Sequence, residues 1–145
     1  MEQNNGFPVT DAPAAADLSD LDDRINEFNA DRTGIRDARY LSIMLRSADG
    51  ELYAGLHGHS WGGCCEIKLL WISENRRGKG LGSLLLRAAE GEAVRRGCRM
   101  ILLATHSFQA PGFYERHGFS HIATLEGYPA GHAEIFMTKD LRPEM

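Results

Sequence analysis

The stretch that decides the fold is residues 66–86, EIKLLWISENRRGKGLGSLLL. It begins with a nearly continuous apolar run, residues 66–72, which is typical of a central strand covered on both faces. A glycine-rich turn follows at residues 78–82. Apolar side chains then recur at helical spacing, at Leu81, Leu84, Leu85 and Ala88. The stretch therefore predicts a strand, a glycine loop and an amphipathic helix.

The chain that follows continues the same unit. Gly97 is placed to end the helix, and residues 100–104 form a second apolar run. A strand, a helical crossover and another strand predict a parallel or splayed strand pair. A short helix is expected over residues 111–118, followed by two final strands at residues 119–125 and 133–139.

The N-terminal part of the chain has a different composition. Residues 1–17 are rich in Pro, Ala, Asn and Asp without any periodicity, which predicts a disordered tail. The remaining residues, 18–145, are enough for a single domain with its own core. Ser19 is expected to cap a first helix that ends at Gly34.

Two strands should follow this first helix. Apolar residues alternate over residues 41–46, Asp49 and Gly50 form a turn signal, and residues 51–56 predict the returning strand. The complete order is one helix, three strands, a helix, a strand, a helix and two strands. It predicts an α/β fold with one central mixed β-sheet flanked by helices.

Composition narrows the function classes. The net charge of −4 over 145 residues argues against a general nucleic-acid-binding surface. No stretch approaches the roughly 20 apolar residues that cross a membrane, and the N-terminus lacks the apolar core of a signal peptide. We therefore expect a cytoplasmic protein that binds neither nucleic acid nor membrane. The three cysteines do not make a disulfide framework, and the adjacent Cys64 and Cys65 should point to opposite faces of a strand.

The glycine loop has the chemistry of an anion site. Glycines let the backbone approach a ligand closely, and the free N–H groups of a helix N-terminus attract an anion. Three side chains add positive charge at the same place: Arg76, Arg77 and Lys79. The alternative is a tight strand-to-helix turn with a solvated basic face. A P-loop is excluded because no Gly-Lys-Ser/Thr follows, and a Rossmann site is disfavoured because no acidic residue lies near Thr105.

Two motifs carry a resemblance to a known family. The loop reads Arg77-Gly78-Lys79-Gly80-Leu81-Gly82, which is similar to the Gln/Arg-x-x-Gly-x-Gly/Ala acetyl-coenzyme A motif of the GNAT family of N-acetyltransferases. Residues 110–119, APGFYERHGF, resemble the Ala-x-x-Phe/Leu-Tyr-x-x-x-Gly-Phe signature of the same family. The resemblance covers roughly residues 20–140. It implies a GNAT-like acyl-coenzyme A N-acyltransferase fold and an enzyme that takes acetyl-coenzyme A as its co-substrate.

The resemblance also implies a mechanism, in which an amine of a small molecule or peptide attacks the thioester directly. The strand before the glycine loop would splay from the next one and hold the pantetheine arm by its backbone near Trp71 and Ile72. Backbone N–H groups of the loop would hold the pyrophosphate. The cofactor-binding residues expected on this basis are Trp71, Ile72, Arg77, Gly78, Lys79, Gly80, Gly82 and Ser83.

Two residues are candidates for proton transfer. Tyr114 lies where the family commonly places the tyrosine that protonates the leaving thiolate; the alternative is a tyrosine packed only for its ring. Glu66, a charged residue in an otherwise apolar strand, lies where some members carry a general base. Its alternatives are a carboxylate paired with Lys68 or facing water, while ordered water deprotonates the amine in many relatives.

Other readings of the sequence carry less support. His57, His59 and Cys64 suggest a metal site, but the transfer needs no metal and none is expected. His106 and His132 are possible contacts to the acceptor, with no stronger argument than their position. The alternative function is a non-catalytic acyl-coenzyme A binding or sensing module, and the resemblance leaves a homodimer open.

Overall fold

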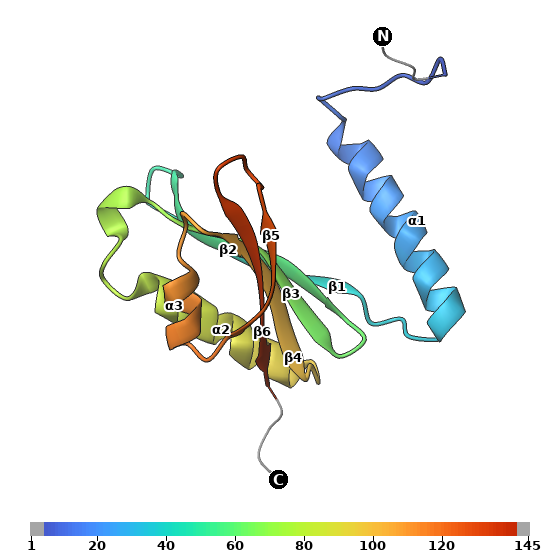
Figure 1. Ribbon diagram of the computed structural model, residues 1–145. Coiled ribbons are helices and arrows are strands. Elements are labelled where there is room, and N and C mark those ends of the chain that lie inside the picture. The colour runs from blue at the N-terminus through green and yellow to red at the C-terminus, as the bar shows by residue number, and fades with distance from the viewer. Residues whose placement is uncertain (1–4, 142–145) are drawn as a thin grey trace. The chain divides into compact units, whose positions relative to one another are not determined.

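The computed structural model describes residues 5–141, which form two compact units that are described separately (Figure 1). The first unit extends to Arg36 and contains the helix α1, Ala15–Thr33. Gly34 ends this helix in the left-handed conformation, with φ 77°, and donates its N–H to the carbonyl of Ala30. The expected C-terminal glycine cap is confirmed, because a residue without Cβ takes this conformation without strain.

The second unit begins at Asp37 and contains a six-stranded mixed sheet in the order β1-β2-β3-β4-β6-β5. The strands are β1 Arg39–Arg46, β2 Leu52–Trp61, β3 Cys64–Ile72, β4 Met100–His106, β5 Ser120–Glu126 and β6 Ala133–Asp140. The helices are the short 3-10 turn η1 Glu74–Arg76, α2 Leu81–Arg95 and α3 Pro111–Arg116. Apart from η1, the predicted order of elements is confirmed.

Both α2 and α3 lie on one side of the sheet, which we call the helix face (Figure 1). Alternate residues of the central strands, such as Leu56, Ile67 and Leu103, point to this face and are buried in the core. The residues between them point to the other side, the open face, on which neither α2 nor α3 packs. Leu69 and Trp71 of β3 are exposed there, so the expectation that helices cover this strand on both faces is wrong for them.

The feature that shapes the sheet is the early end of the β3–β4 ladder. The two parallel strands are paired over only four positions, and the last pair joins Ile67 to Leu103. Both strands continue beyond this point, β3 to Ile72 and β4 to His106, while β4 stays paired with β6 on its other side. The expected splayed pair is therefore present, and it opens in the middle of the sheet.

A bulge lies at the same position. His57 of β2 faces Leu69, whereas the next residue, Gly58, faces Ile67, so Lys68 is an extra residue in β3. Gly58 allows an unusually close approach of the two backbones, because a Cβ at this position would lie 2.1 Å from the carbonyl oxygen of Glu66. The bulge turns β3 where its pairing with β4 stops.

Several predicted boundaries are wrong. The first helix begins at Ala15. Its N-cap residue is Ala14, which makes no capping hydrogen bond from a side chain, and Ser19 lies inside the helix. Residues 15–17 of the predicted tail belong to its first turn, and residues 1–4 lie outside the described part of the chain. The returning strand β2 continues to Trp61 rather than ending near residue 56. The proposed tail and the single domain over residues 18–145 stay predictions.

The buried stripe of α2 also differs from the one predicted. Leu84 is 56% exposed, while the buried residues of this helix are Leu85, Leu86, Ala89 and Ala93. The helical spacing was therefore right but the stripe is rotated, because Leu86 and not Leu84 packs on the sheet. The adjacent cysteines do point to opposite faces: Cys65 is fully buried and Cys64 is partly exposed.

We predict that Gly58→Ala lowers the stability of the protein. The new methyl group would meet backbone atoms, which cannot move aside cheaply, and overpacking of this kind costs about 1–3 kcal/mol. At roughly 2–4 °C per kcal/mol, thermal unfolding should show a fall of several degrees. Gly91→Ala is the control: its Cβ meets only the tip of Arg95 in a helix interior, so stability should stay equal or rise. An unchanged melting temperature for Gly58→Ala would show that the backbones do not need their close approach.

Candidate active site

The loop between η1 and α2 presents backbone N–H groups to solvent. Gly78 and Gly80 adopt left-handed conformations, with φ 76° and 84°, which other residues rarely take. Gly80 is the N-terminal cap of α2, and no side chain caps this end of the helix. The N–H groups of the first turn, up to Ser83, therefore have no acceptor within the helix, and they are arranged for an anion.

The three cations near the loop have different roles in the structure. Arg77 donates from Nε to the carbonyl oxygen of Ile72 at 2.8 Å, which ties the loop to the end of β3. The guanidinium of Arg76 stacks over the ring of Tyr53, 3.8 Å from its centroid. Lys79 is exposed and makes no ion pair among the described residues. Arg77 thus fixes the loop, and Lys79 is the cation best placed to reach a ligand.

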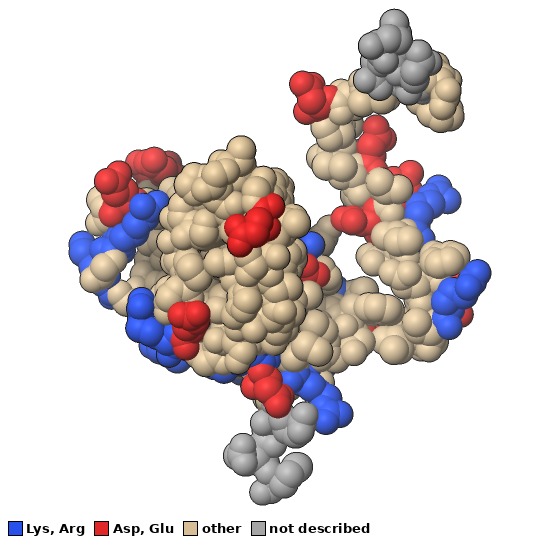
Figure 2. All heavy atoms as spheres, viewed as in Figure 1, with Lys and Arg blue, Asp and Glu red and all other residues tan. Residues whose placement is uncertain are grey.

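A shallow pocket of about 370 Å³ lies at this loop, lined by Asn75, Arg76, Lys79 and Leu81. Figure 2 shows Lys and Arg side chains gathered over the loop, with acidic side chains beside them. A pocket with cations, left-handed glycines and a free helix N-terminus fits a phosphate-bearing ligand. The bare turn with a solvated basic face is therefore the weaker explanation of the glycines.

The splay between β3 and β4 lies next to this loop. Beyond Ile67, the backbone of β3 on the β4 side has no ladder partner, so the edge from Lys68 to Trp71 is open for hydrogen bonds to a ligand, while the carbonyl of Ile72 accepts from Arg77. The first turn of α2 packs closely against the end of β3. A Cβ added at Gly82 would lie 3.4 Å from the Phe113 side chain and 3.5 Å from the Ile72 side chain. The structure thus brings Trp71, Ile72 and the glycine loop together along one continuous edge.

Tyr114 lies on the helix face. It is buried, with its ring 5.1 Å from that of Phe113 and 5.7 Å from that of Phe119. Burial disfavours the phenolate and raises the pKa of Tyr114 above its ordinary value. The side chain is therefore both packed for its ring and held as a neutral phenol, which can donate a proton.

Glu66 lies on the open face, because its neighbours Cys65 and Ile67 are buried on the helix face. One carboxylate oxygen is 3.1 Å from Nζ of Lys68, and the other is 3.8 Å from Nε2 of His59 on β2. The side chain is 33% exposed. The structure thus shows the pairing with Lys68, and it also leaves the carboxylate within reach of solvent.

The two candidates for proton transfer lie on opposite faces of the sheet. Glu66 belongs to the last but one residue pair of the β3–β4 ladder. Tyr114 reaches the core from α3, the helix that follows β4. A group held in the splay would therefore have a phenol on the helix face and a carboxylate on the open face.

Four aromatic rings form a cluster at the end of β4 that the sequence did not predict. His106 and His132 are singled out separately in the sequence, but the structure joins them through Phe108, and Tyr128 packs against His106. The ring of Phe108 lies 5.5 Å from that of His106 and 5.1 Å from that of His132, and Tyr128 lies 5.3 Å from His106. Phe108 has no signal in the sequence, because it lies in a loop without periodicity, whereas Tyr128 belongs to the turn expected between the last two strands.

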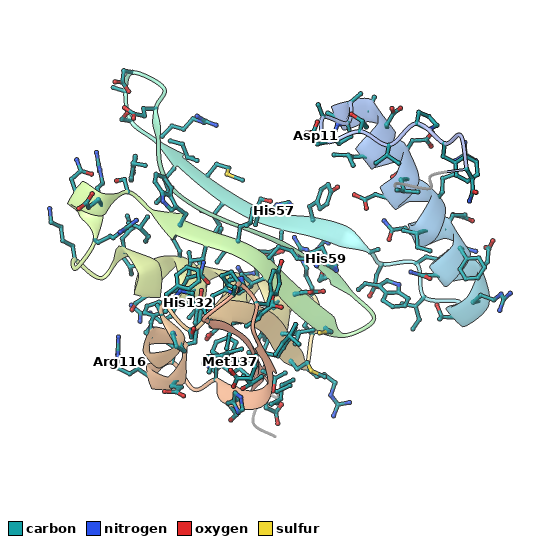
Figure 3. The ribbon with its side chains drawn as sticks, turned by 45° about the horizontal axis from the view of Figure 1, so that its top comes forward. Asp11, His57, His59, Arg116, His132 and Met137 are labelled. Carbon is teal, nitrogen blue, oxygen red and sulfur yellow. The ribbon has the colours of Figure 1, made fainter. Side chains whose placement is uncertain are left out.

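The remaining histidines of interest lie on β2. His57 and His59 do share one face of this strand, as Figure 3 shows. His57 hydrogen-bonds through Nδ1 with the hydroxyl of Ser42 and its ring lies 5.2 Å from that of Tyr40. Within residues 5–141, no three His, Cys, Asp or Glu side chains come together in a way that would hold a metal ion.

Comparison with known proteins agrees with this geometry. The model of the acetyltransferase (GNAT) family matches residues 9–119. An acetyltransferase of Agrobacterium fabrum is 33% identical over 92% of this chain and 97% of its own. The blasticidin-S acetyltransferase of Streptomyces morookaense is 39% identical over 76% of this chain and 84% of its own.

The fold is also found among solved structures. A crystal structure of a protein from Agrobacterium tumefaciens superposes with a TM-score of 0.79 at 32% identity, covering 93% of this chain and 98% of that one. This structure matches almost the whole chain, and so more of it than residues 9–119, which the family model covers. The chain belongs to the GNAT family and is an acetyl-coenzyme A-dependent N-acetyltransferase.

Proposed function

We propose that this enzyme acetylates a primary amine of a small molecule by direct attack of the amine on the thioester of acetyl-coenzyme A. The observation that carries the proposal is the splay, with a neutral phenol on one face and a carboxylate on the other. Two curated relatives are named for small-molecule acceptors, blasticidin-S and streptothricin. Peptide acceptors and a homodimer stay predictions. A cytoplasmic location belongs to the proposal, because acetyl-coenzyme A is made and used inside cells.

The cofactor would lie along the edge that the loop and β3 form. The N–H groups from Gly78 to Ser83 would bind its pyrophosphate, with Lys79 adding charge. The free edge of β3 near Trp71 and Ile72 would hydrogen-bond the pantetheine amides, much as a strand would. This places the thioester in the splay, where donors on β3 polarise its carbonyl.

Each residue on either side of the thioester would have one role. Glu66 would take the proton of the attacking amine on the open face, and Lys68 and His59 would hold its carboxylate in place. Tyr114 would give its proton to the coenzyme A thiolate as the carbon–sulfur bond breaks. The proton balance closes when Glu66 releases its proton to solvent and solvent returns a proton to Tyr114 after product release.

The cysteines argue against an acetyl-cysteine intermediate. Cys65 is fully buried, and burial raises its pKa to about 11. Burial also raises the pKa of the Cys64 and Cys98 thiols. A thiol acts as a nucleophile only as the thiolate, so all three are poorly suited to accept the acetyl group at neutral pH.

No helix within residues 5–141 is long and apolar enough to span a membrane.

We predict that acetyl-coenzyme A raises the melting temperature of the protein, while NAD and ATP at the same concentration do not. A ligand at 100 times its dissociation constant stabilises the folded state by about 2.7 kcal/mol. Lys79→Glu should weaken acetyl-coenzyme A binding about tenfold or more, because it replaces a cation beside the pyrophosphate with an anion. Arg87→Glu, an equal charge change on an exposed site of α2, is the matched control. Equal affinity in the two variants would remove Lys79 from the cofactor site.

Tyr114→Phe should lower kcat by about 100-fold or more, since it removes the proton donor and keeps the ring. Affinity for acetyl-coenzyme A and the melting temperature should change little. Because burial raises its pKa, the phenol stays protonated beyond the ordinary value of about 10, so activity should not fall with rising pH before that point. Tyr40→Phe on the exposed strand β1 is the control. A kcat for Tyr114→Phe equal to wild type would leave Tyr114 as a packing residue only.

Glu66→Gln should lower kcat/KM for the amine by about 100-fold or more, because an amide keeps the shape of the side chain but accepts no proton at neutral pH. Binding of acetyl-coenzyme A, measured by calorimetry, should be unchanged. Glu92→Gln, which removes a carboxylate from α2 far from the splay in sequence, gives the matched comparison. Full activity of Glu66→Gln would assign the deprotonation to ordered water instead.

A further inference from the structure

We propose that the rings of His106, Phe108, Tyr128 and His132 form the surface that binds a planar aromatic part of the amine acceptor. The name ring cluster is used for these four residues. The inference rests on the proposed function and deepens it, because it assigns the substrate class of the same site. Nothing in the motifs of the family carries it.

The ring cluster lies beside the splay on the side from which the amine would approach. His106 alternates along β4 with the buried Leu103 and Thr105 on the helix face, so it points to the open face, as Glu66 does. It lies three residues beyond Leu103, where the β3–β4 ladder ends, or about 10 Å along the strand. His106 thus belongs to the same face of the sheet as Glu66, but it lies on β4 rather than on β3.

Two of the four rings are largely exposed to solvent, although they pack against the imidazoles. Phe108 is 55% exposed and Tyr128 is 53% exposed. They meet the imidazoles edge to face or stacked, at centroid distances of 5.1–5.5 Å. Aromatic rings prefer such arrangements, and a further ring can add to them in the same way.

Hydrogen bonds hold the two loops that carry the rings. The carbonyl of Tyr128 accepts from Nδ1 of His106 at 3.2 Å, which fixes the plane of the imidazole. Ser107 is bonded twice to Ala133, from its N–H to the carbonyl at 2.8 Å and from the Ala133 N–H to its hydroxyl at 3.1 Å. The side chain of Gln109 accepts from the N–H of His106 at 2.7 Å. An exposed apolar surface on a frame fixed in this way is preorganised for a ligand.

The chemistry of the cluster favours a planar ring over a simple cation. None of the four residues carries a carboxylate, although Glu134 lies opposite His106 in the β4–β6 ladder. His132, which Figure 3 labels, and Tyr128 both belong to the turn between β5 and β6. The amine itself would turn toward Glu66, and the aromatic part of the acceptor would lie against the rings.

The test compares pairs of primary amines that differ only in an aryl or a saturated ring, such as 2-phenylethylamine and 2-cyclohexylethylamine. Wild type should acetylate the aryl member of each pair with the higher kcat/KM. Phe108→Leu and His132→Leu should lower this preference about threefold to tenfold, the range of a single aromatic contact. Phe108→Tyr keeps a ring and should keep the preference. A preference that is absent in wild type, or unchanged in Phe108→Leu, would overturn the inference while leaving the acetyltransferase proposal intact.

A binding measurement keeps the inference testable even without turnover. In the presence of coenzyme A, 2-phenylethylamine should shift the imidazole NMR signals of His106 and His132, because a stacked ring changes their shielding. The cyclohexyl amine should leave them in place. Equal shifts with both amines, or none with either, would overturn the ring cluster as a binding surface. Acetylation of no amine at all, with these shifts present, would instead count against the proposed function.

Discussion

The central constraint on this molecule is the close approach of β2 and β3 at Gly58. Two backbones cannot come this near each other if a Cβ stands between them, so the glycine makes the bulge at Lys68 possible. The bulge in turn bends β3 away just where its pairing with β4 ends, at Ile67. The candidate cofactor site depends on this opening, because beyond Ile67 the edge of β3 has no ladder partner on the β4 side.

The opening would let residues from both faces of the sheet act on one bound group. A sheet that is paired throughout separates its faces completely, and a residue on one face cannot act on a group bound to the other. Where the strands part, a thioester can lie in the plane of the sheet. The fold then supplies different environments on either side: a dry core around Tyr114 keeps a phenol neutral, and the open face around Glu66 keeps a carboxylate accessible. The difference in burial is what would separate the proton donor from the proton acceptor.

Local patterns predicted most of this fold, and they failed where contacts between distant residues decide. The strand, glycine loop and helix around residues 66–95 follow from spacing, and Gly34 marked the end of α1. Nothing local shows that β3 would carry an extra residue, because a bulge is defined only against its partner strand. The start of α1 was missed since Ala14 offers no capping side chain. Spacing alone does not show that Leu86 rather than Leu84 is buried, because this depends on which side of α2 faces the sheet.

In the candidate site, too, some residues can be identified from local sequence and others only from the fold. The glycine loop can be identified in the sequence because backbone groups would hold its ligand, and their availability depends on glycine and on the helix end, both visible in the sequence. Arg77 matches the motif, but its Nε is used to tie the loop to Ile72, a role that only the structure reveals. The ring cluster is the extreme case, since Phe108 and Tyr128 both pack against His106 from two loops that lie about twenty residues apart in the chain. The residues that would bind the cofactor thus lie in one local segment, whereas the proposed acceptor surface is assembled from loops that are distant in the chain. This is why the sequence indicates the family, while the acceptor depends on the fold.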